Sequence, residues 1–378
     1  MAENTDQAVL ARFDDLRAGT ALQFSTCDAR IVATHPGRVQ QALHAVEQAV
    51  AEGSWAFGYV AYEAAPGLDP HARVHDPTPG LPLVWFGISE RPDPTPGPLP
   101  AGGHRSEPWR IEWSRPEHAA KVVRVHDAIA AGDSYQCNLT TRMRSRIDGD
   151  LLGYHGDLVR SQQAAYNAYL DLGRWVVASA SPECFLRWND DVLVSVPMKG
   201  TAPRGASPTA DQAARRDLLA SAKDRAENVM IVDLIRNDLS RVARSGTVTV
   251  AELLACEQYP TVWQLTSSVT SRTRPGTTLV DVFAALFPCG SVTGAPKTST
   301  MALIADLESG PRGVYCGAIG YLAPGPLRRA SFNVAIRTVL VDRSDGSAVY
   351  GVGGGVTWSS RAEAEYREME AKARVLAF

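Results

Sequence analysis

The sequence predicts an α/β protein of the α+β type, in which strands pair as hairpins and helices are inserted between them. Strand-like segments follow one another closely at residues 175–178, 185–188 and 192–196, and helical segments at 210–220 and 222–242 come after them. Neighbouring strands can pair through short turns, whereas parallel strands need long crossovers. This order of strands and helices along the chain therefore favours α+β layers over a doubly wound parallel sheet.

The other segments fit this fold class when they are taken along the chain. A helix starts at Ser114, where Glu117 completes a capping box, and it stops at Gly132. Apolar spacing and alternation predict the rest, with short helices between the later strands: a helix at 39–51, strands at 57–62, 83–87, 135–142 and 247–250, and a last helix at 361–376.

A Pro/Gly-rich connector at residues 91–108 is the best candidate for a domain boundary. It separates an N-terminal part, residues 1–100, from residues 110–378, which hold every dense motif, and residues 101–109 form the crossing between them.

Composition excludes several functional classes. The 378 residues are 45% hydrophobic and carry a net charge of −3, so nothing draws the chain to nucleic acid or to a membrane surface. The polar segment Met1 to Asp6 lacks the features of a signal peptide, and no apolar run is long enough to span a membrane. Six cysteines without a Cys-x-x-Cys pair indicate reduced thiols in a cytoplasmic protein without a zinc site.

The histidines limit the chemistry further. All eight lie at or before His155, so the motif-rich remainder has none. A Ser-His-Asp triad or a histidine metal site is therefore excluded there. Proton transfer and metal binding must use carboxylates, lysine, tyrosine or backbone groups.

Lys199 is the most informative residue. It lies between a short apolar strand and a Gly-Thr turn, where a solvated role is a poor fit. A lysine shielded from water near another cation becomes a neutral nucleophile. The alternative is an inert packed lysine, which is costly without a function.

Two acidic helices supply candidate ligands for a hard cation. Glu365, Glu368 and Lys372 share one face of the last helix, after the turn 351–355, whose glycines allow a ligand to approach the backbone. Asp224 and Glu227 lie at i, i+3 on the middle helix. Each segment alone also fits a solvated acidic face, but one glutamate from each would suit Mg²⁺.

Two further segments suit an anionic ligand. Residues 287–297 form a Gly-rich turn that enters a helix, with Pro296 near its first position and free N–H groups before it. The spacing is not that of a phosphate-binding P-loop. Arg337 is expected inside an apolar strand, where an arginine pairs with a carboxylate of the protein or of a ligand.

Together, these segments resemble the motifs of chorismate-utilising enzymes. The order of the motifs is similar over residues ~110–378, with weaker support from residues 58–65. The matching segments are Ser181-Pro182-Glu183, Pro197-Met198-Lys199-Gly200-Thr201, residues 223–228, 235–239, 291–297 and 316–321, and Gly353-Gly354-Gly355 through Glu365 to Glu368. The family includes anthranilate synthase, isochorismate and salicylate synthases, and aminodeoxychorismate synthase component I.

Two positions discriminate among these relatives. Gln136 stands where isochorismate and salicylate synthases use a lysine to activate water, and glutamine cannot serve as that base. Lys199 stands where anthranilate synthases have alanine, and this lysine marks aminodeoxychorismate synthase. Gln264 departs from the histidine of several relatives, which puts a supporting or leaving-group role at that position in doubt.

The resemblance implies amination of chorismate by ammonia to 4-amino-4-deoxychorismate, for para-aminobenzoate and folate synthesis. Lys199 would attack ring C2 while Glu183 protonates the departing C4 oxygen. The ring carboxylate would lie on Mg²⁺ held by Glu227 and Glu368. The remaining expected contacts are Asp224 and Glu365 in support of the metal, and Arg337, Tyr315, Gly354, Gly355, Ser291, Lys372, Gln136 and Thr201 toward the substrate.

The resemblance also implies an architecture and a partner. The fold would be two packed β-sheets that form a sandwich core with helices outside, as in anthranilate synthase component I. Residues 101–109 would then be a surface crossing in one globular unit. Ammonia would come from a separate glutamine amidotransferase subunit.

Several alternatives stay open. Glu183 could pair with Arg187 or Arg204, Arg337 could be a structural ion-pair partner, and Tyr315 could belong to the core. The chain could instead be an anthranilate synthase or a 2-amino-2-deoxyisochorismate synthase component I, or a non-catalytic scaffold for the amidotransferase.

Overall fold

The computed structural model describes residues 9–259, 262–325 and 329–378. Its strands form two ten-stranded sheets in which the paired strands are antiparallel. The segment Met1 to Asp6, which is expected not to be a signal peptide, lies outside the described residues.

The first sheet runs in the order β16-β8-β20-β19-β10-β9-β1-β2, and β6 and β7 also pair with β8. Its strands are β1 (Ala11–Asp15), β2 (Thr20–Phe24), β6 (His104–Ser106), β7 (Arg110–Ile111), β8 (Gln136–Gly149), β9 (Tyr166–Asp171), β10 (Trp175–Ser181), β16 (Gly294–Ala295), β19 (Thr338–Asp342) and β20 (Ser347–Thr357).

The second sheet runs in the order β13-β15-β12-β11-β18-β17-β4-β5-β3, and β14 pairs with β15. Its strands are β3 (Ala29–Ala33), β4 (Trp55–Val60), β5 (Val84–Ser89), β11 (Cys184–Asn189), β12 (Val192–Val196), β13 (Met198–Pro203), β14 (Thr249–Gln258), β15 (Val262–Arg272), β17 (Ala318–Ala323) and β18 (Arg329–Val334).

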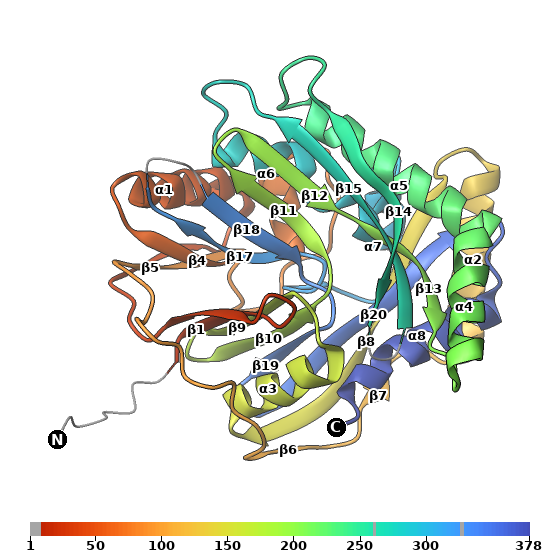
Figure 1. Ribbon diagram of the computed structural model, residues 1–378, viewed down its shortest axis with the longest axis horizontal. Helices are drawn as coiled ribbons and strands as arrows, with labels where there is room; N and C mark the ends of the chain where they lie inside the picture. Colours follow the sequence, from red (N-terminus) through yellow and green to blue (C-terminus); the bar gives the residue numbers. More distant parts are fainter. Residues whose placement is uncertain (1–8, 260–261, 326–328) are drawn as a thin grey trace.

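The helices lie outside the sheets (Figure 1). They are α1 (Val39–Ala51), α2 (Arg115–Ala130), α3 (Leu151–Gln162), α4 (Pro208–Ala220), α5 (Ala222–Ser240), α6 (Leu279–Leu286), α7 (Lys297–Leu307) and α8 (Ala362–Ala373), with 3-10 turns η1 (Pro36–Arg38), η2 (Tyr62–Gly67), η3 (Gly290–Val292) and η4 (Arg374–Leu376).

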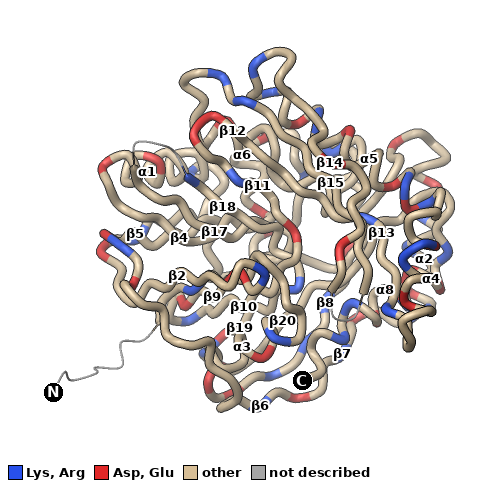
Figure 2. The backbone as a smooth tube through the Cα atoms, in the orientation of Figure 1, with Lys and Arg blue, Asp and Glu red and all other residues tan. Residues whose placement is uncertain are grey.

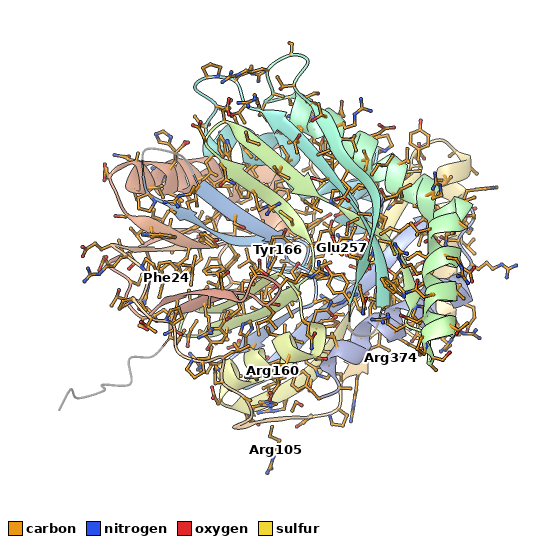
Figure 3. All side chains as sticks on the ribbon, in the orientation of Figure 1. Phe24, Arg105, Arg160, Tyr166, Glu257 and Arg374 are labelled. Carbon is orange, nitrogen blue, oxygen red and sulfur yellow. The ribbon has the colours of Figure 1, made fainter. Side chains whose placement is uncertain are left out.

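The core has an inner layer between the sheets and outer layers under the helices. In the inner layer, Phe24 of the first sheet stacks on Phe57 of the second, with ring centroids 4.5 Å apart; Phe24 is labelled in Figure 3. Helices α1, α5 and α6 cover the outer face of the second sheet, and α3 and α8 cover that of the first. This arrangement confirms the expected sandwich with helices outside, because apolar strand faces are buried on both sides.

Local signals located several elements correctly. Helix α2 follows the N-cap Ser114, whose capping box with Glu117 is complete. Helix α1 and strand β12 have the predicted bounds. Strands β8 and β14 are longer than predicted because pairing with β20 and β15 extends them beyond their apolar segments.

Helix α3 was not expected, and its packing explains why. Gly153 and Gly156 lower its intrinsic helix propensity. A Cβ on Gly156 would lie only 1.9 Å from the main-chain O of Pro100, so the glycine lets the Pro/Gly-rich connector pack directly on the helix. Arg160, labelled in Figure 3, donates to the same carbonyl at 2.7 Å.

The charged residues are spread along the chain. Figure 2 shows lysines and arginines interspersed with aspartates and glutamates along the described backbone. Within the described residues, no helix combines the length and the apolar character needed to cross a membrane.

Candidate active site

Lys199 lies on β13, at the side of the molecule where β13, β20, α5 and α8 come together (Figure 1). Its Nζ donates to the main-chain O of Ser291 at 3.1 Å. Burial lowers the pKa of Lys199, Glu227 opposes this shift, and the nearby Lys372 adds to it. Lys199 therefore loses its proton more easily than an exposed lysine does, as a nucleophilic amine requires.

Glu183 lies between β10 and β11 and faces the same cavity as Lys199. Its residue is only 3% exposed, and Oε1 has no hydrogen-bond partner among the described residues. Burial raises the pKa of Glu183 to about 7, against the opposing effects of the Ser291 side chain and the Lys199 charge. A carboxyl group in this state can donate a proton at neutral pH.

The alternative partners of Glu183 are engaged elsewhere. Arg204 pairs with Asp211 at 2.6 Å, and Arg187 lines a separate cavity between β1 and β18. Ser291 lies beside both candidate groups, because its main-chain O accepts from Lys199 and the residue lines the same cavity as Glu183. Its hydroxyl donates to Sγ of Cys289 at 3.3 Å.

The glycines of β20 make room for a ligand. A Cβ on Gly355 would lie 2.8 Å from Nε2 of Gln136 and 3.1 Å from Nζ of Lys199. A Cβ on Gly354 would lie 3.3 Å from a carboxylate oxygen of Glu365. Side chains here would fill the space that Lys199 faces, so these glycines keep the cavity open.

Gln136 is fully buried, and neither atom of its amide has a partner among the described residues. Buried amides are nearly always hydrogen-bonded in proteins. The free amide lies beside Gly355, which lines the cavity.

The acidic residues of α5 and α8 converge, with lysines between them. Lys223 Nζ lies 3.5 Å from Glu365 and 3.7 Å from Glu227, and Lys372 Nζ lies 2.7 Å from Glu368. Lys372 also donates to the main-chain O of Gly353 at 2.8 Å. Burial raises the pKa of Glu227, whereas Lys372 holds that of Glu368 below its usual range.

Asp224 lines the same cavity from the first turn of α5. Across the described residues, no three His, Cys, Asp or Glu side chains stand close enough together to form a ready-made metal site. The acidic residues thus share one cavity without forming a coordination shell of their own.

Arg337 corrects one expectation. It does not lie inside a strand but in the link between β18 and β19, at a left-handed φ of 52°. The apolar run 334–336 continues past the end of β18 and therefore resembles a strand. Arg337 nevertheless lines the cavity, and its charge acts on Glu183 and on Tyr350. Pro296 is the N-cap of α7, next to its first residue, as expected.

Thr201 lies at the exposed side of the cavity. Its hydroxyl donates to Oε1 of Gln264 at 2.8 Å, and Nε2 of Gln264 donates to the main-chain O of Gly200 at 2.9 Å. Gln264 therefore holds the part of β13 that follows Lys199, so the Gly-Thr turn expected after Lys199 is instead part of this strand.

The cavity that these residues enclose has a volume of about 130 Å³. Twelve of the expected residues line it directly. Of the other two, Gln136 lies beside the lining residue Gly355, and Gly354 lies beside the acidic side chains of α8. Sequence reasoning missed Lys223 as a contact of the acidic residues, although its i, i+4 spacing to Glu227 is a visible signal. Eight further lining residues were not predicted as site contacts: Asn138, Pro182, Met198, Gly200, Gln264, Val292, Ile336 and Gly353.

This fold and cavity agree with the comparisons to known proteins. The chain belongs to the chorismate-binding enzyme family, whose description matches residues 10–378. It is 37% identical over 284 residues to aminodeoxychorismate synthase component 1 of Salmonella typhimurium, covering 75% of this chain and 60% of that protein. It is 45% identical over 249 residues to aminodeoxychorismate synthase of Streptomyces griseus, covering 66% of this chain and 34% of that protein.

The matched segments thus span less than two thirds of the length of either relative. Among solved structures, anthranilate synthase component I from Streptococcus pneumoniae TIGR4 has a TM-score of 0.77 and 24% identity, covering 98% of this chain and 91% of that one. The structural match shows the shared fold, and the family expected from the motifs is confirmed.

Proposed function

We propose that the chain converts chorismate and ammonia to 4-amino-4-deoxychorismate and water, with Lys199 as a covalent catalyst. The observation that carries this proposal is the pairing of two unusual groups in one cavity. Lys199 has a lowered pKa, and the buried Glu183 has a pKa raised to about 7. One is ready to give an electron pair and the other to give a proton.

The first half of the reaction forms an amine adduct. Neutral Lys199 attacks ring C2 and becomes a charged secondary ammonium, the two conjugated ring double bonds each shift by one bond, and the C4–O bond breaks. Glu183 protonates the departing oxygen, which leaves as water. Acid catalysis of this kind contributes ~10²–10⁴-fold.

The second half transfers nitrogen from ammonia. Ammonia attacks C4, the two ring double bonds shift back, and the bond from C2 to Lys199 breaks. The amine leaves with the electron pair of that bond, and the proton lost by the new ammonium group restores Glu183. Lys199 and Glu183 therefore return to their starting states.

The cavity offers separate anchors for the two carboxylates of chorismate. Arg337, Tyr315 and the backbone of Gly354 and Gly355 would hold the enolpyruvyl carboxylate. Fork-shaped guanidinium groups and free N–H groups both suit carboxylates. Ser291, Lys372, Gln136 and Thr201 are further candidate contacts to the ring and its substituents.

The acidic residues fit Mg²⁺ as the anchor of the ring carboxylate. Mg²⁺ takes oxygen ligands, usually one or two protein carboxylates with water and substrate oxygens completing the shell. Glu227 and Glu368 would hold it, with Asp224 and Glu365 in support. The ammonium of Lys223 beside Glu227 and Glu365 supports this, because it marks a position that favours positive charge. Bound Mg²⁺ would neutralise the substrate carboxylate and favour the uncharged form of Lys199.

The names of the relatives also support a partner subunit that works together with this chain. A component 1 protein is one part of an assembly, and we propose that a glutamine amidotransferase supplies ammonia to this chain. The proposed product, 4-amino-4-deoxychorismate, would then be used for para-aminobenzoate and folate synthesis.

A product assay tests the proposal. The chain is incubated with chorismate, an ammonium salt and Mg²⁺, and the product is analysed by mass, by fluorescence and by coupling to 4-amino-4-deoxychorismate lyase. We expect an aminated product that retains the enolpyruvyl group and that the lyase converts to para-aminobenzoate. Fluorescent anthranilate with pyruvate release, or an aminated product that the lyase rejects, would favour the 2-amino alternatives. Background turnover with amidotransferase binding retained would favour the scaffold.

A further inference from the structure

Cys289 and Ser291 lie in one tight turn at the wall of the candidate active site. The turn is η3, where the main-chain O of Cys289 accepts from the N–H of Val292 at 3.1 Å and from the hydroxyl of Thr293 at 3.1 Å. The side chains of Cys289 and Ser291 are both buried. The backbone therefore fixes the position of Ser291, and the rotation of its hydroxyl is the freedom that remains.

The hydroxyl of Ser291 has one proton and two neighbours that can accept it. It donates to Sγ of Cys289 at 3.3 Å. Glu183 is the second neighbour: burial raises its pKa, and the side chain of Ser291 is the first of the groups that oppose this rise. A hydroxyl donates its single proton to one acceptor at a time. The structure shows that proton on the sulfur, while Oε1 of Glu183 has no hydrogen-bond partner among the described residues.

Cys289 contributes a hydrogen-bond acceptor and no charge. Burial raises the pKa of its thiol to about 12, so the sulfur is neutral when Glu183 titrates. The other titratable groups that interact through charge with Glu183 are Lys199 on β13, Arg337 in the link between β18 and β19, Cys184 on β11 and Tyr259 after β14. Removal of the sulfur leaves these four groups in place.

The choice of acceptor decides how easily Glu183 keeps its proton. A hydroxyl that donates to a carboxylate stabilises the ionised form and lowers the pKa of the carboxyl group. A carboxyl group without that donor stays protonated to a higher pH and can still protonate a leaving oxygen at neutral pH. The sulfur of Cys289 therefore favours the acid form of Glu183 by engaging Ser291.

We propose that Cys289 is a positioning residue, which holds the Ser291 hydroxyl on its sulfur and so leaves Glu183 able to give its proton to the departing oxygen of chorismate. This inference rests on the proposed function, in which Glu183 is the acid of adduct formation. Cys289 is not one of the cavity-lining residues that the structure describes, so it acts through Ser291 and not on the substrate.

Cys289→Ala tests the inference by removing the acceptor. The matched control is Cys137→Ala, because Cys137 is a buried thiol that packs among apolar residues of α2 and α7. The rate of adduct formation is measured against pH by single-turnover kinetics. In Cys289→Ala the hydroxyl turns to Glu183, so the alkaline limb should move to lower pH by about half a unit to one unit. The acidic limb set by Lys199 should stay in place, and Cys137→Ala should move neither limb.

Two further variants show whether the effect passes through Ser291. Cys289→Ser supplies an oxygen acceptor in place of the sulfur and should restore the alkaline limb of the unmodified chain. The double variant Cys289→Ala/Ser291→Ala removes the donor itself, so its limb should return to the original pH or above it. Cys289→Val, which fills the space without an acceptor, replaces Cys289→Ala if that variant does not fold.

Three results would overturn the inference: an unmoved limb in the folded Cys289→Ala or Cys289→Val protein, a limb in Cys289→Ser displaced as far as in Cys289→Ala, or a limb that stays displaced in the double variant. Failure of the unmodified chain to form the adduct, or an alkaline limb that persists in Glu183→Gln, contradicts the proposed function itself. Normal adduct formation with a limb that depends on Glu183 but not on Cys289 contradicts this inference alone.

Discussion

Two glutamates of this protein are equally buried and yet differ in their surroundings. Glu63 in η2 is 2% exposed and Glu183 is 3% exposed, and burial raises the pKa of each to about 7. The oxygens of Glu63 accept the backbone N–H groups of Arg312 at 2.7 Å and Gly313 at 2.9 Å. In contrast, Oε1 of Glu183 has no partner in the described part of the chain.

Because both glutamates have a raised pKa but differ in their hydrogen-bond partners, a shifted pKa alone does not identify a catalytic acid. The hydrogen bonds of Glu63 stay within the protein and hold the loop at Arg312, whose guanidinium in turn donates to Val292 and Asn138 of the cavity wall. Glu183 has an unused hydrogen-bonding position that faces a cavity and a lysine. The open position beside the cavity, and not the pKa, therefore distinguishes Glu183 from Glu63.

The strongest test of this comparison is Glu183→Gln. The amide keeps the shape of the side chain but cannot donate a proton to the leaving oxygen. We expect the rate of adduct formation to fall by ~10²–10⁴-fold with little loss of stability. Single-turnover kinetics and urea unfolding measure the two effects, and a rate within a few-fold of the unmodified chain would remove Glu183 from its role.

The pH dependence of the reaction rate also distinguishes Glu183 from Glu63, with an effect of intermediate size. Glu183 must be protonated to act, so the rate should fall about tenfold per pH unit once the pH exceeds about 7. Lys199 must be neutral, so its lowered pKa should set an acidic limb. The alkaline limb should disappear in Glu183→Gln and persist in Glu63→Gln, and its persistence in Glu183→Gln would assign it to another group.

Stability should depend on pH through both glutamates. A pKa raised in the folded state means that the folded protein binds the proton more tightly than the unfolded chain does. The stabilisation is therefore complete below about 4.5 and is lost as the pH rises through about 7. Urea unfolding across this range should show the decline, and each Gln variant should flatten it.

The smallest effect on catalysis is expected for Glu63→Gln. The amide N–H₂ would face the backbone N–H groups of Arg312 and Gly313, so one hydrogen bond becomes a repulsive contact. We expect a loss of about 1–3 kcal/mol in the free energy of unfolding, with turnover within about twofold. A rate loss as large as that of Glu183→Gln would erase the distinction between the two residues.

The sequence predicts the candidate site residues better than their surroundings. Lys199, Glu227 and Glu368 follow from local spacing and motif, and the helices that carry the two glutamates were expected near their observed bounds. These properties are local, and local periodicity determines them.

The surroundings of the candidate site residues depend on contacts between segments that are far apart in the sequence. The free amide of Gln136 faces Gly355 because β8 pairs with β20, more than 200 residues away in sequence. The ring of Tyr315 lies on Gly351, a residue of a distant strand, at the wall of the cavity. Helix α3 was missed because its glycines serve the connector that packs on it. No local pattern encodes such contacts.

The most direct test of the account is intact-protein mass spectrometry of the chain after incubation with chorismate and Mg²⁺ without ammonia. The account predicts a species heavier by one chorismate less one water, with the added mass on Lys199, that disappears when ammonium is added. Continued amination of chorismate without any such adduct, or at full rate in Lys199→Ala, would contradict covalent catalysis by this lysine.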